Sequence, residues 1–225
     1  MTPGEVSAAL GRAVERAGGC AADVGLRCVG PGVYRSPVAL RVGVDAEVVA
    51  NFVRDVAGIG AVEVDGGFLR IVVERPEELA SDVARNPSYG WGRVKAVAWA
   101  DRPRTFDNPG FRVRYAYARA AAVGRRARDL GVEAGPPEGL GRREELALLA
   151  LLGEMPGWVR QGELGGFLVR LADGFHDVYE RCPALPQGGE EPGALHAARV
   201  TLAEAARVAL GNGLKMIGET PRERI

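Results

Sequence analysis

Cysteine, histidine and lysine are scarce in this 225-residue sequence, and long apolar runs are absent. Its three cysteines, Cys20, Cys28 and Cys182, form no C-x-x-C pair, which argues against a disulfide framework and against a zinc cage. We expect them to be reduced and inert, and we expect no metal or other cofactor. No run of about 18 apolar residues could span a membrane, and residues 1–10 lack the pattern of a signal peptide. These absences predict a globular, cytoplasmic protein.

Net charge is absent too, because 29 basic residues balance 29 acidic ones. This balance excludes a uniformly basic protein but not a local basic face, because salt screens charges that lie more than about 10 Å apart. Between residues 108 and 130, six arginines are accompanied by a single acidic residue, Asp129. The six are Arg112, Arg114, Arg119, Arg125, Arg126 and Arg128. A helix with this composition can gather phosphates.

Residues 1–76 mix helical and strand-like patterns. Two runs of alternating polarity, residues 61–65 and 68–74, flank Gly66-Gly67, which is the pattern of a β-hairpin. Helices are expected over residues 3–17 and 45–57, and a further strand over residues 24–29. The pattern predicts a small α+β domain.

Helical periodicity dominates the rest of the chain. Residues 77–107 contain several prolines and glycines that break any period, and we expect a connector with some helix. Beyond it, residues 108–225 are expected to form an all-α bundle. Apolar residues recur at steps of three and four over residues 113–130, 164–182 and 202–217, and a shorter helix is expected near residues 143–153. Asp107 fits the N-cap of the first of these helices, and residues 186–193 read as an exposed loop.

Three motifs in the bundle resemble the anticodon-binding (DALR) domain of arginyl-tRNA synthetases. Residues 107–119, DNPGFRVRYAYAR, are similar to the family's N-P-x-[YF]-x-V-Q-Y-A-[HY]-A-R. Residues 171–185, LADGFHDVYERCPAL, are similar to L-A-x-x-F-H-x-F-Y-x-x-C-x-V-L. Residues 198–225 begin with ARV, continue with GLKMIG and close with PRERI, which is similar to A-R-L, N-G-L-x-L-L-G and P-E-R-M. The family's closing methionine is replaced by Ile225, which implies relaxed anticodon discrimination.

Residues 1–76 resemble the N-terminal additional domain of the same family, which touches the corner of the tRNA. GVYRSPVAL at residues 32–40 is similar to G-D-Y-S-T-N-x-A-L, and VEVDGGFLRI at residues 62–71 is similar to V-E-[IV]-x-x-G-F-I-N-F. Arg70 stands where the family has a polar amide, so the resemblance implies a phosphate contact there in place of a base contact.

The catalytic part of a synthetase has no counterpart in this sequence. The histidines His176 and His196 are not part of an H-x-G-H element, and Lys215-Met216 is not followed by the rest of a K-M-S-K loop. Residues 77–107 are too few for a parallel sheet with its crossover helices. The resemblance therefore implies a tRNA-binding protein that is not an enzyme by itself.

Guanidinium groups contact phosphates in pairs of hydrogen bonds and stack on unpaired bases, so arginines beside tyrosines are typical of a surface that grips RNA loops. Tyr115 is the expected stacking residue, whereas Tyr117 is equally compatible with packing. His176 is expected to be structural or at the surface, and Tyr179 is assigned to the core by its spacing. The residues expected to bind RNA are Arg112, Arg114, Tyr115, Arg119, Arg126, Arg70 and Arg199.

The leading hypothesis is a non-catalytic module that holds a tRNA, expected to be tRNA-Arg, and presents it to a partner enzyme or regulates its use. Two alternatives remain open. The chain could be the tRNA-binding subunit of a split arginine-tRNA ligase, or a protein-interaction scaffold that has lost RNA binding.

Overall fold

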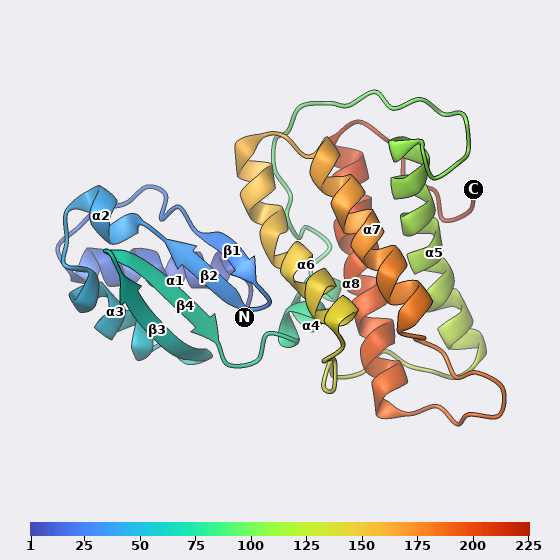
Figure 1. Ribbon diagram of the computed structural model, residues 1–225, viewed down its shortest axis with the longest axis horizontal. Helices are drawn as coiled ribbons and strands as arrows, with labels where there is room; N and C mark the ends of the chain where they lie inside the picture. Colours follow the sequence, from blue (N-terminus) through green and yellow to red (C-terminus); the bar gives the residue numbers. More distant parts are fainter. The chain divides into compact units, whose positions relative to one another are not determined.

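Two units, each with its own hydrophobic core, make up the computed structural model, which describes all 225 residues (Figure 1). Unit 1 comprises Met1–Pro76 and unit 2 comprises Glu77–Ile225. No helix in either unit combines the length and apolarity needed to cross a membrane.

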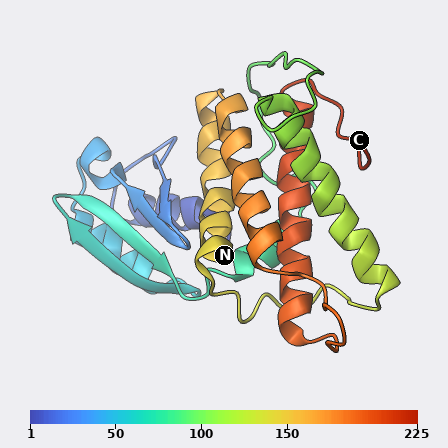
Figure 2. The same ribbon diagram turned by 45° about the vertical axis from the view of Figure 1, so that its right-hand side comes forward.

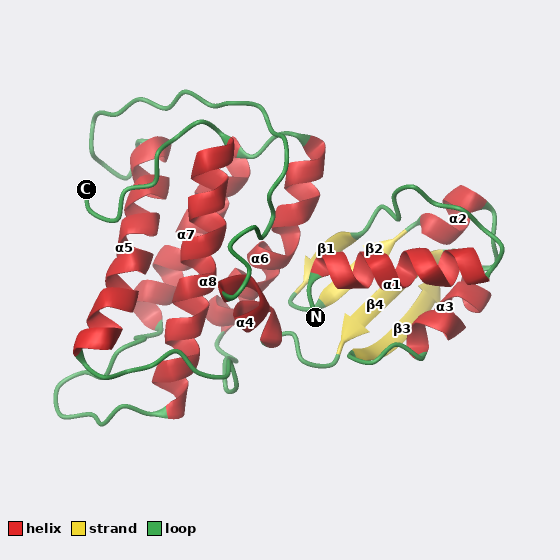
Figure 3. Ribbon diagram, turned by 180° about the vertical axis from the view of Figure 1, so that it is seen from behind, coloured by secondary structure: helices red, strands yellow, loops and turns green.

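Unit 1 is a four-stranded antiparallel sheet with strand order β1-β2-β4-β3 and helices packed on one face (Figure 3). Its elements are α1 (Pro3–Arg16), β1 (Arg27–Gly30), β2 (Val33–Ser36), α2 (Val38–Val42), α3 (Ala46–Arg54), β3 (Ile59–Asp65) and β4 (Phe68–Val73). Leu69 and Ile71 of β4 point into the core beneath α1 and α3, whereas Arg70 between them points to the opposite, exposed face. This alternation follows from the two-residue period of a strand.

The predicted hairpin is confirmed by the pairing of β3 with β4. Gly66 and Gly67, with φ of 54° and 80°, form its turn in the left-handed region that a residue with a side chain rarely adopts. The strand expected over residues 24–29 begins only at Arg27, and β2 and α2 were not predicted. Elements of four and five residues between glycines and prolines are too short to show a period.

Unit 2 is an all-α bundle, as the periodicity predicts, and the α+β class with a helical second part is confirmed. Its helices are α4 (Glu78–Ala84), α5 (Pro109–Asp129), α6 (Arg143–Gln161), α7 (Gly165–Arg181) and α8 (Ala194–Met216). Helix α5 packs against α7 and α8, and α6 packs against α7, as two views agree (Figures 1 and 2). Helix α8 begins eight residues before the apolar stripe that predicted it.

Helix α6 continues through Pro156 to Gln161, whereas the sequence predicts its end near residue 153. A proline inside a helix lacks the N–H that would bind the carbonyl four residues earlier. That carbonyl, of Leu152, instead accepts a hydrogen bond of 2.8 Å from the Tyr89 hydroxyl. This hydrogen bond satisfies the carbonyl that Pro156 leaves without a partner in the helix, so α6 continues beyond the proline.

Residues 77–107 belong to unit 2 rather than standing between two domains. Helix α4 packs on α8, and the Asn212 side chain of α8 donates hydrogen bonds to the Pro87 and Tyr89 carbonyls at 2.9 and 3.0 Å. Beyond α4 this segment has no helix or strand, and the Asn212 side chain holds two of its carbonyls against the bundle.

Candidate nucleic-acid interface

Helix α5 is capped by Asn108 and not by Asp107, which corrects the expectation from the sequence. The Asn108 Oδ1 accepts hydrogen bonds from the N–H groups of Gly110 and Phe111 at 3.0 and 3.3 Å. Its Nδ2 donates to the carbonyls of Ala100 and Pro103. An amide can accept from the helix and donate to the preceding chain at once, whereas a carboxylate such as that of Asp107 can only accept, so Asn108 fixes where α5 starts.

A stacked ladder of side chains follows one face of α5. The rings of Phe111 and Tyr115 lie 5.4 Å apart and nearly parallel, at 11°. One turn later, the Arg119 guanidinium lies 4.6 Å from the centre of the Tyr115 ring. Its other neighbour is Tyr179 of α7, with a ring centre 4.5 Å away. Steps of four residues place these groups above one another on the helix, so Tyr115 and Arg119 are each covered on two sides.

His176 of α7 lies behind this ladder and is buried. Its Nδ1 lies 3.4 Å from Arg119 Nη1, and its Nε2 lies 3.4 Å from the carbonyl oxygen of Arg112. Burial lowers the pKa of His176, the hydrogen bond to the Arg112 carbonyl opposes that shift, and the charge of Arg119 adds to it. The ring is therefore neutral at neutral pH, in line with the structural role expected for it.

Three of the α5 arginines expected to bind RNA take part in ion pairs. Arg112 pairs with Asp173 at 3.1 Å, Arg119 with Glu180 at 3.5 Å and Arg114 with Glu219 at 3.0 Å. The carboxylates of Asp173 and Glu180 are 49% and 63% exposed, so these pairs contribute only about 0–1 kcal/mol each. A phosphate can replace such a carboxylate. The Arg114–Glu219 pair is more deeply buried, at 11% and 19% exposure, and resists such exchange.

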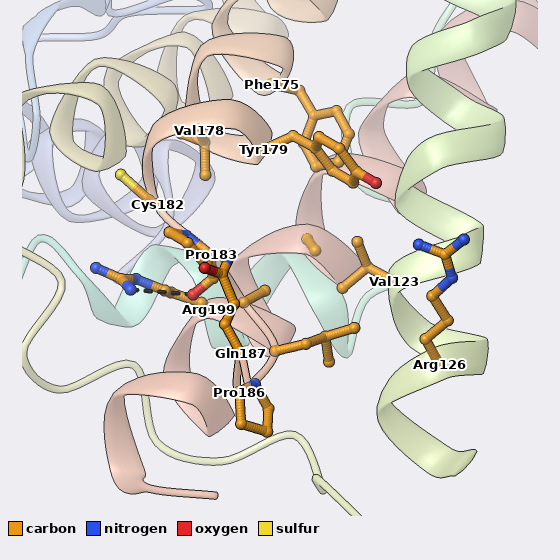
Figure 4. A pocket seen from close by; sticks show the side chains of 13 residues that line it. Val123, Arg126, Phe175, Val178, Tyr179, Cys182, Pro183, Pro186, Gln187 and Arg199 are labelled. Carbon is orange, nitrogen blue, oxygen red and sulfur yellow. Dashed lines mark hydrogen bonds between the residues drawn. The ribbon is translucent and has the colours of Figure 1, made fainter. Parts of the chain in front are cut away.

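The Arg126 side chain is exposed and forms no ion pair or hydrogen bond. It lines a pocket of about 230 Å³ between α5, α7, α8 and the loop that follows α7. Figure 4 shows Arg126 on α5 across from Tyr179 and Phe175 on α7. Val123 and Leu185 supply apolar lining. The pocket thus combines an aromatic ring, an unpaired guanidinium and an apolar floor.

Arg199 also lines this pocket, but its charge is used within the protein. Its Nε donates to Glu145 at 2.7 Å, with side-chain exposures of 7% and 0%, and its Nη1 donates to the Pro183 carbonyl. Glu145 in turn accepts from the N–H groups of Gly141 and Arg142 at 2.9 Å each. The structure thus gives Arg199 a role in holding α8, α6 and the loop after α7 together.

The segment after α8 returns along α5. Glu219 binds Arg114, and Glu223 binds Arg125 through its carboxylate and its carbonyl, both at 3.2 Å. This contact occupies the side of α5 that carries Arg114 and Arg125. The side that carries Arg119 and Arg126 is left open toward α7.

Arg70, the residue expected to bind RNA in unit 1, belongs to a row of charged side chains across the exposed face of the sheet. Arg27 pairs in register with Arg35, Arg35 with Arg70, and Arg70 with Glu63. Arg70 forms an ion pair of 2.9 Å with Glu63, while Arg35 lies over the Phe68 ring at 4.3 Å. Like charges directly opposite on neighbouring strands repel, and the exposed carboxylates of Glu63 and Asp65, 2.9 Å from Arg70 and 3.6 Å from Arg35, offset part of this repulsion.

Several residues of these surfaces were missed by the sequence reasoning. Tyr179 was assigned to the core, yet it is half-buried and stacks on Arg119. Phe106 contacts Phe111, Tyr115 and His176 edge-on. The four-residue spacing of positions 111, 115 and 119 could have predicted their stacking on one face of the helix, but the sequence carries no such signal for Phe106 or Tyr179. Tyr117, by contrast, is buried in the core.

Residues 113–225, half of the chain, match the family described as DALR anticodon binding domain. The chain belongs to this family. It is also similar to an arginine–tRNA ligase of Clavibacter sepedonicus, with 40% identity over 131 residues. That alignment covers 54% of this chain and 24% of the ligase, so the chain corresponds to about a quarter of that relative.

Proposed function

We propose that this chain is a non-catalytic tRNA-binding protein that holds tRNA-Arg and presents it to a partner enzyme or regulates its use. The observation that carries the proposal is that the matched anticodon-binding family covers the same helices, α5, α7 and α8, that build the arginine and aromatic surface. The similarity to an arginine–tRNA ligase supports the choice of tRNA.

The anticodon loop is proposed to lie over the open side of α5 and along α7. Arg112 and Arg119 would exchange their exposed carboxylate partners for phosphates, because those pairs are weak. Arg126 needs no such exchange. Three guanidiniums along one side of a helix match the repeating negative charge of an RNA backbone.

An unpaired base of the loop is proposed to enter the pocket beside Arg126. The exposed part of Tyr179 offers a ring on which a base can stack, and Val123 and Leu185 offer an apolar floor. Tyr115, the stacking residue expected from the sequence, has its ring covered by Phe111 and Arg119. In this proposal Tyr115 holds Arg119, and Tyr179 contacts the base.

Titration of tRNA-Arg by gel shift at two salt concentrations tests the proposal. If three arginines each neutralise one phosphate of a single-stranded loop, affinity falls about 20-fold between about 50 and about 200 mM salt. A matched RNA hairpin without the anticodon loop is the control. Affinity that is independent of salt, or equal for both RNAs, would refute the proposed contact and favour the scaffold.

The similarity to an arginine–tRNA ligase also supports a second candidate, a tRNA-binding subunit of a split arginine–tRNA ligase. Both candidates predict no ATP–pyrophosphate exchange by this chain alone. They differ when the chain is incubated with cell extract and then purified again. A subunit of a split ligase would bring its catalytic partner, and with it ATP–pyrophosphate exchange activity, whereas the first candidate would not.

A further inference from the structure

His176 is the only buried histidine, and the tRNA contacts proposed above do not use its ring. We propose that neutral His176 is a positioning residue for tRNA binding, which holds the Arg119 guanidinium between Tyr115 and Tyr179 and releases it when protonated. This role rests on the proposed function. It concerns a residue that touches no RNA and acts only through Arg119.

The two neighbours of the ring determine which nitrogen carries the proton. A guanidinium can only donate, so the His176 Nδ1, 3.4 Å from Arg119 Nη1, must accept. A carbonyl oxygen can only accept, so the Nε2, 3.4 Å from the Arg112 carbonyl, must donate. Both contacts are satisfied by one neutral tautomer, with hydrogen on Nε2. A protonated ring would direct an N–H at the Arg119 cation.

Arg119 depends on this contact once its exposed partner Glu180 is exchanged for a phosphate, because Tyr115 and Tyr179 fix the plane of the guanidinium but not its rotation within that plane. Tyr115 and Tyr179 lie on its two faces, and Glu180 binds the same Nη1 atom that faces His176. The side chain is 22% exposed, so part of the guanidinium edge reaches solvent. A guanidinium already held in place loses less rotamer freedom when it binds a phosphate.

The charged groups around His176 set the direction of its pH response. Arg119 and burial disfavour the protonated ring, while Asp173 and Glu180 and the Arg112 carbonyl favour it, and the net effect lowers the pKa. Protonation of His176 is therefore confined to the pH range more acidic than the ordinary histidine pKa of about 6.5. We expect tRNA affinity to fall as the pH drops through that range. A histidine that contacted phosphate directly would give the opposite sign.

Two substitutions separate the two hydrogen bonds. His176→Asn places an amide oxygen near the position of Nδ1 and can still accept from Arg119. His176→Gln places its amide near the position of Nε2 and can still bind the Arg112 carbonyl, but it offers Arg119 nothing. Both variants lose the aromatic ring and one hydrogen bond, so their free energies of unfolding are expected to fall by similar amounts.

Fluorescence titration of tRNA-Arg with both variants, between about pH 7.5 and about pH 5.5, tests the role. We expect His176→Asn to retain most of the affinity and to lose the pH dependence. We expect His176→Gln to bind about fivefold more weakly at about 0.1 M salt, as when one phosphate contact is lost. Equal affinities of the two variants, or tighter binding of the wild type at low pH, would overturn the proposal.

Long-range ¹⁵N–¹H NMR of the histidine rings gives a second reading without RNA. The chain has only two histidines, so the His176→Asn spectrum assigns the signals. We expect the tautomer with hydrogen on Nε2 at neutral pH. Hydrogen on Nδ1 would overturn the proposed role of His176 in positioning Arg119. A wild type with this tautomer that binds no tRNA would overturn the proposed function and the positioning role together. Binding that His176→Gln leaves intact would overturn the positioning role alone.

Discussion

Replacing Arg199 with methionine is expected to lower the free energy of unfolding by about 3–5 kcal/mol. The substitution leaves Glu145, which is fully buried, without its 2.7 Å partner. An unpaired carboxylate in a core is among the costliest defects a substitution can create. Methionine preserves much of the side-chain volume, so the decrease in the free energy of unfolding measures the loss of the Arg199 charge rather than a cavity. Urea unfolding followed by circular dichroism measures it.

Arg170→Met is the matched control for this stability experiment. Arg170 also pairs with a glutamate, Glu154, at 3.2 Å, but its side chain is 51% exposed. Such a pair contributes about 0–1 kcal/mol. If Arg199→Met lowered the free energy of unfolding no more than Arg170→Met does, Arg199 would not be the structural link described above. The expectation from the sequence that Arg199 binds RNA would then stand again.

Reversing the charge of Arg126 with Arg126→Glu is expected to weaken tRNA binding about 25-fold at about 0.1 M salt. Loss of one phosphate contact in a single-stranded loop accounts for about fivefold, and repulsion from the new carboxylate for a similar factor. The log–log salt slope should shrink by about 1.4. Arg126 is exposed and without a protein partner, so stability should hardly change.

Arg143→Glu is the control for this charge reversal. It changes net charge by the same amount and lies on the exposed start of α6, a helix that contributes no residue to the pocket beside Arg126. We expect less than about a twofold change in affinity and an unchanged slope, because distant exposed charges are screened. Equal losses in the two variants would show that binding follows overall charge and not the side of α5 that faces α7.

Periodic features of the fold could be predicted, whereas contacts between distant residues could not. The stripes through Val113, Leu171 and Leu210 predict their helices, because burial imposes a helical period on the sequence. The extension of α6 could not be found this way. It depends on Tyr89, 63 residues before the Leu152 carbonyl that it binds.

The same distinction applies to the candidate interface. The concentration of arginines on α5 is visible in the sequence, but their partners on α7 and after α8 are not. Arg199 and Arg126 have the same side chain, and only the presence of Glu145 next to Arg199, 54 residues away in sequence, separates a buried link from an exposed contact. Tyr179 follows Val178 directly at the edge of an apolar stripe, so spacing alone could not tell which of the two is exposed.

Sequencing the RNA that copurifies with the chain tests most directly whether it is a tRNA-binding protein. Affinity purification from its own cells at low salt, with the Arg126→Glu variant as the matched background, should enrich tRNA. We expect arginine-accepting tRNAs to rank first and to be depleted in the variant. Recovery of total RNA without enrichment of any tRNA, identical for wild type and variant, would contradict the proposed function.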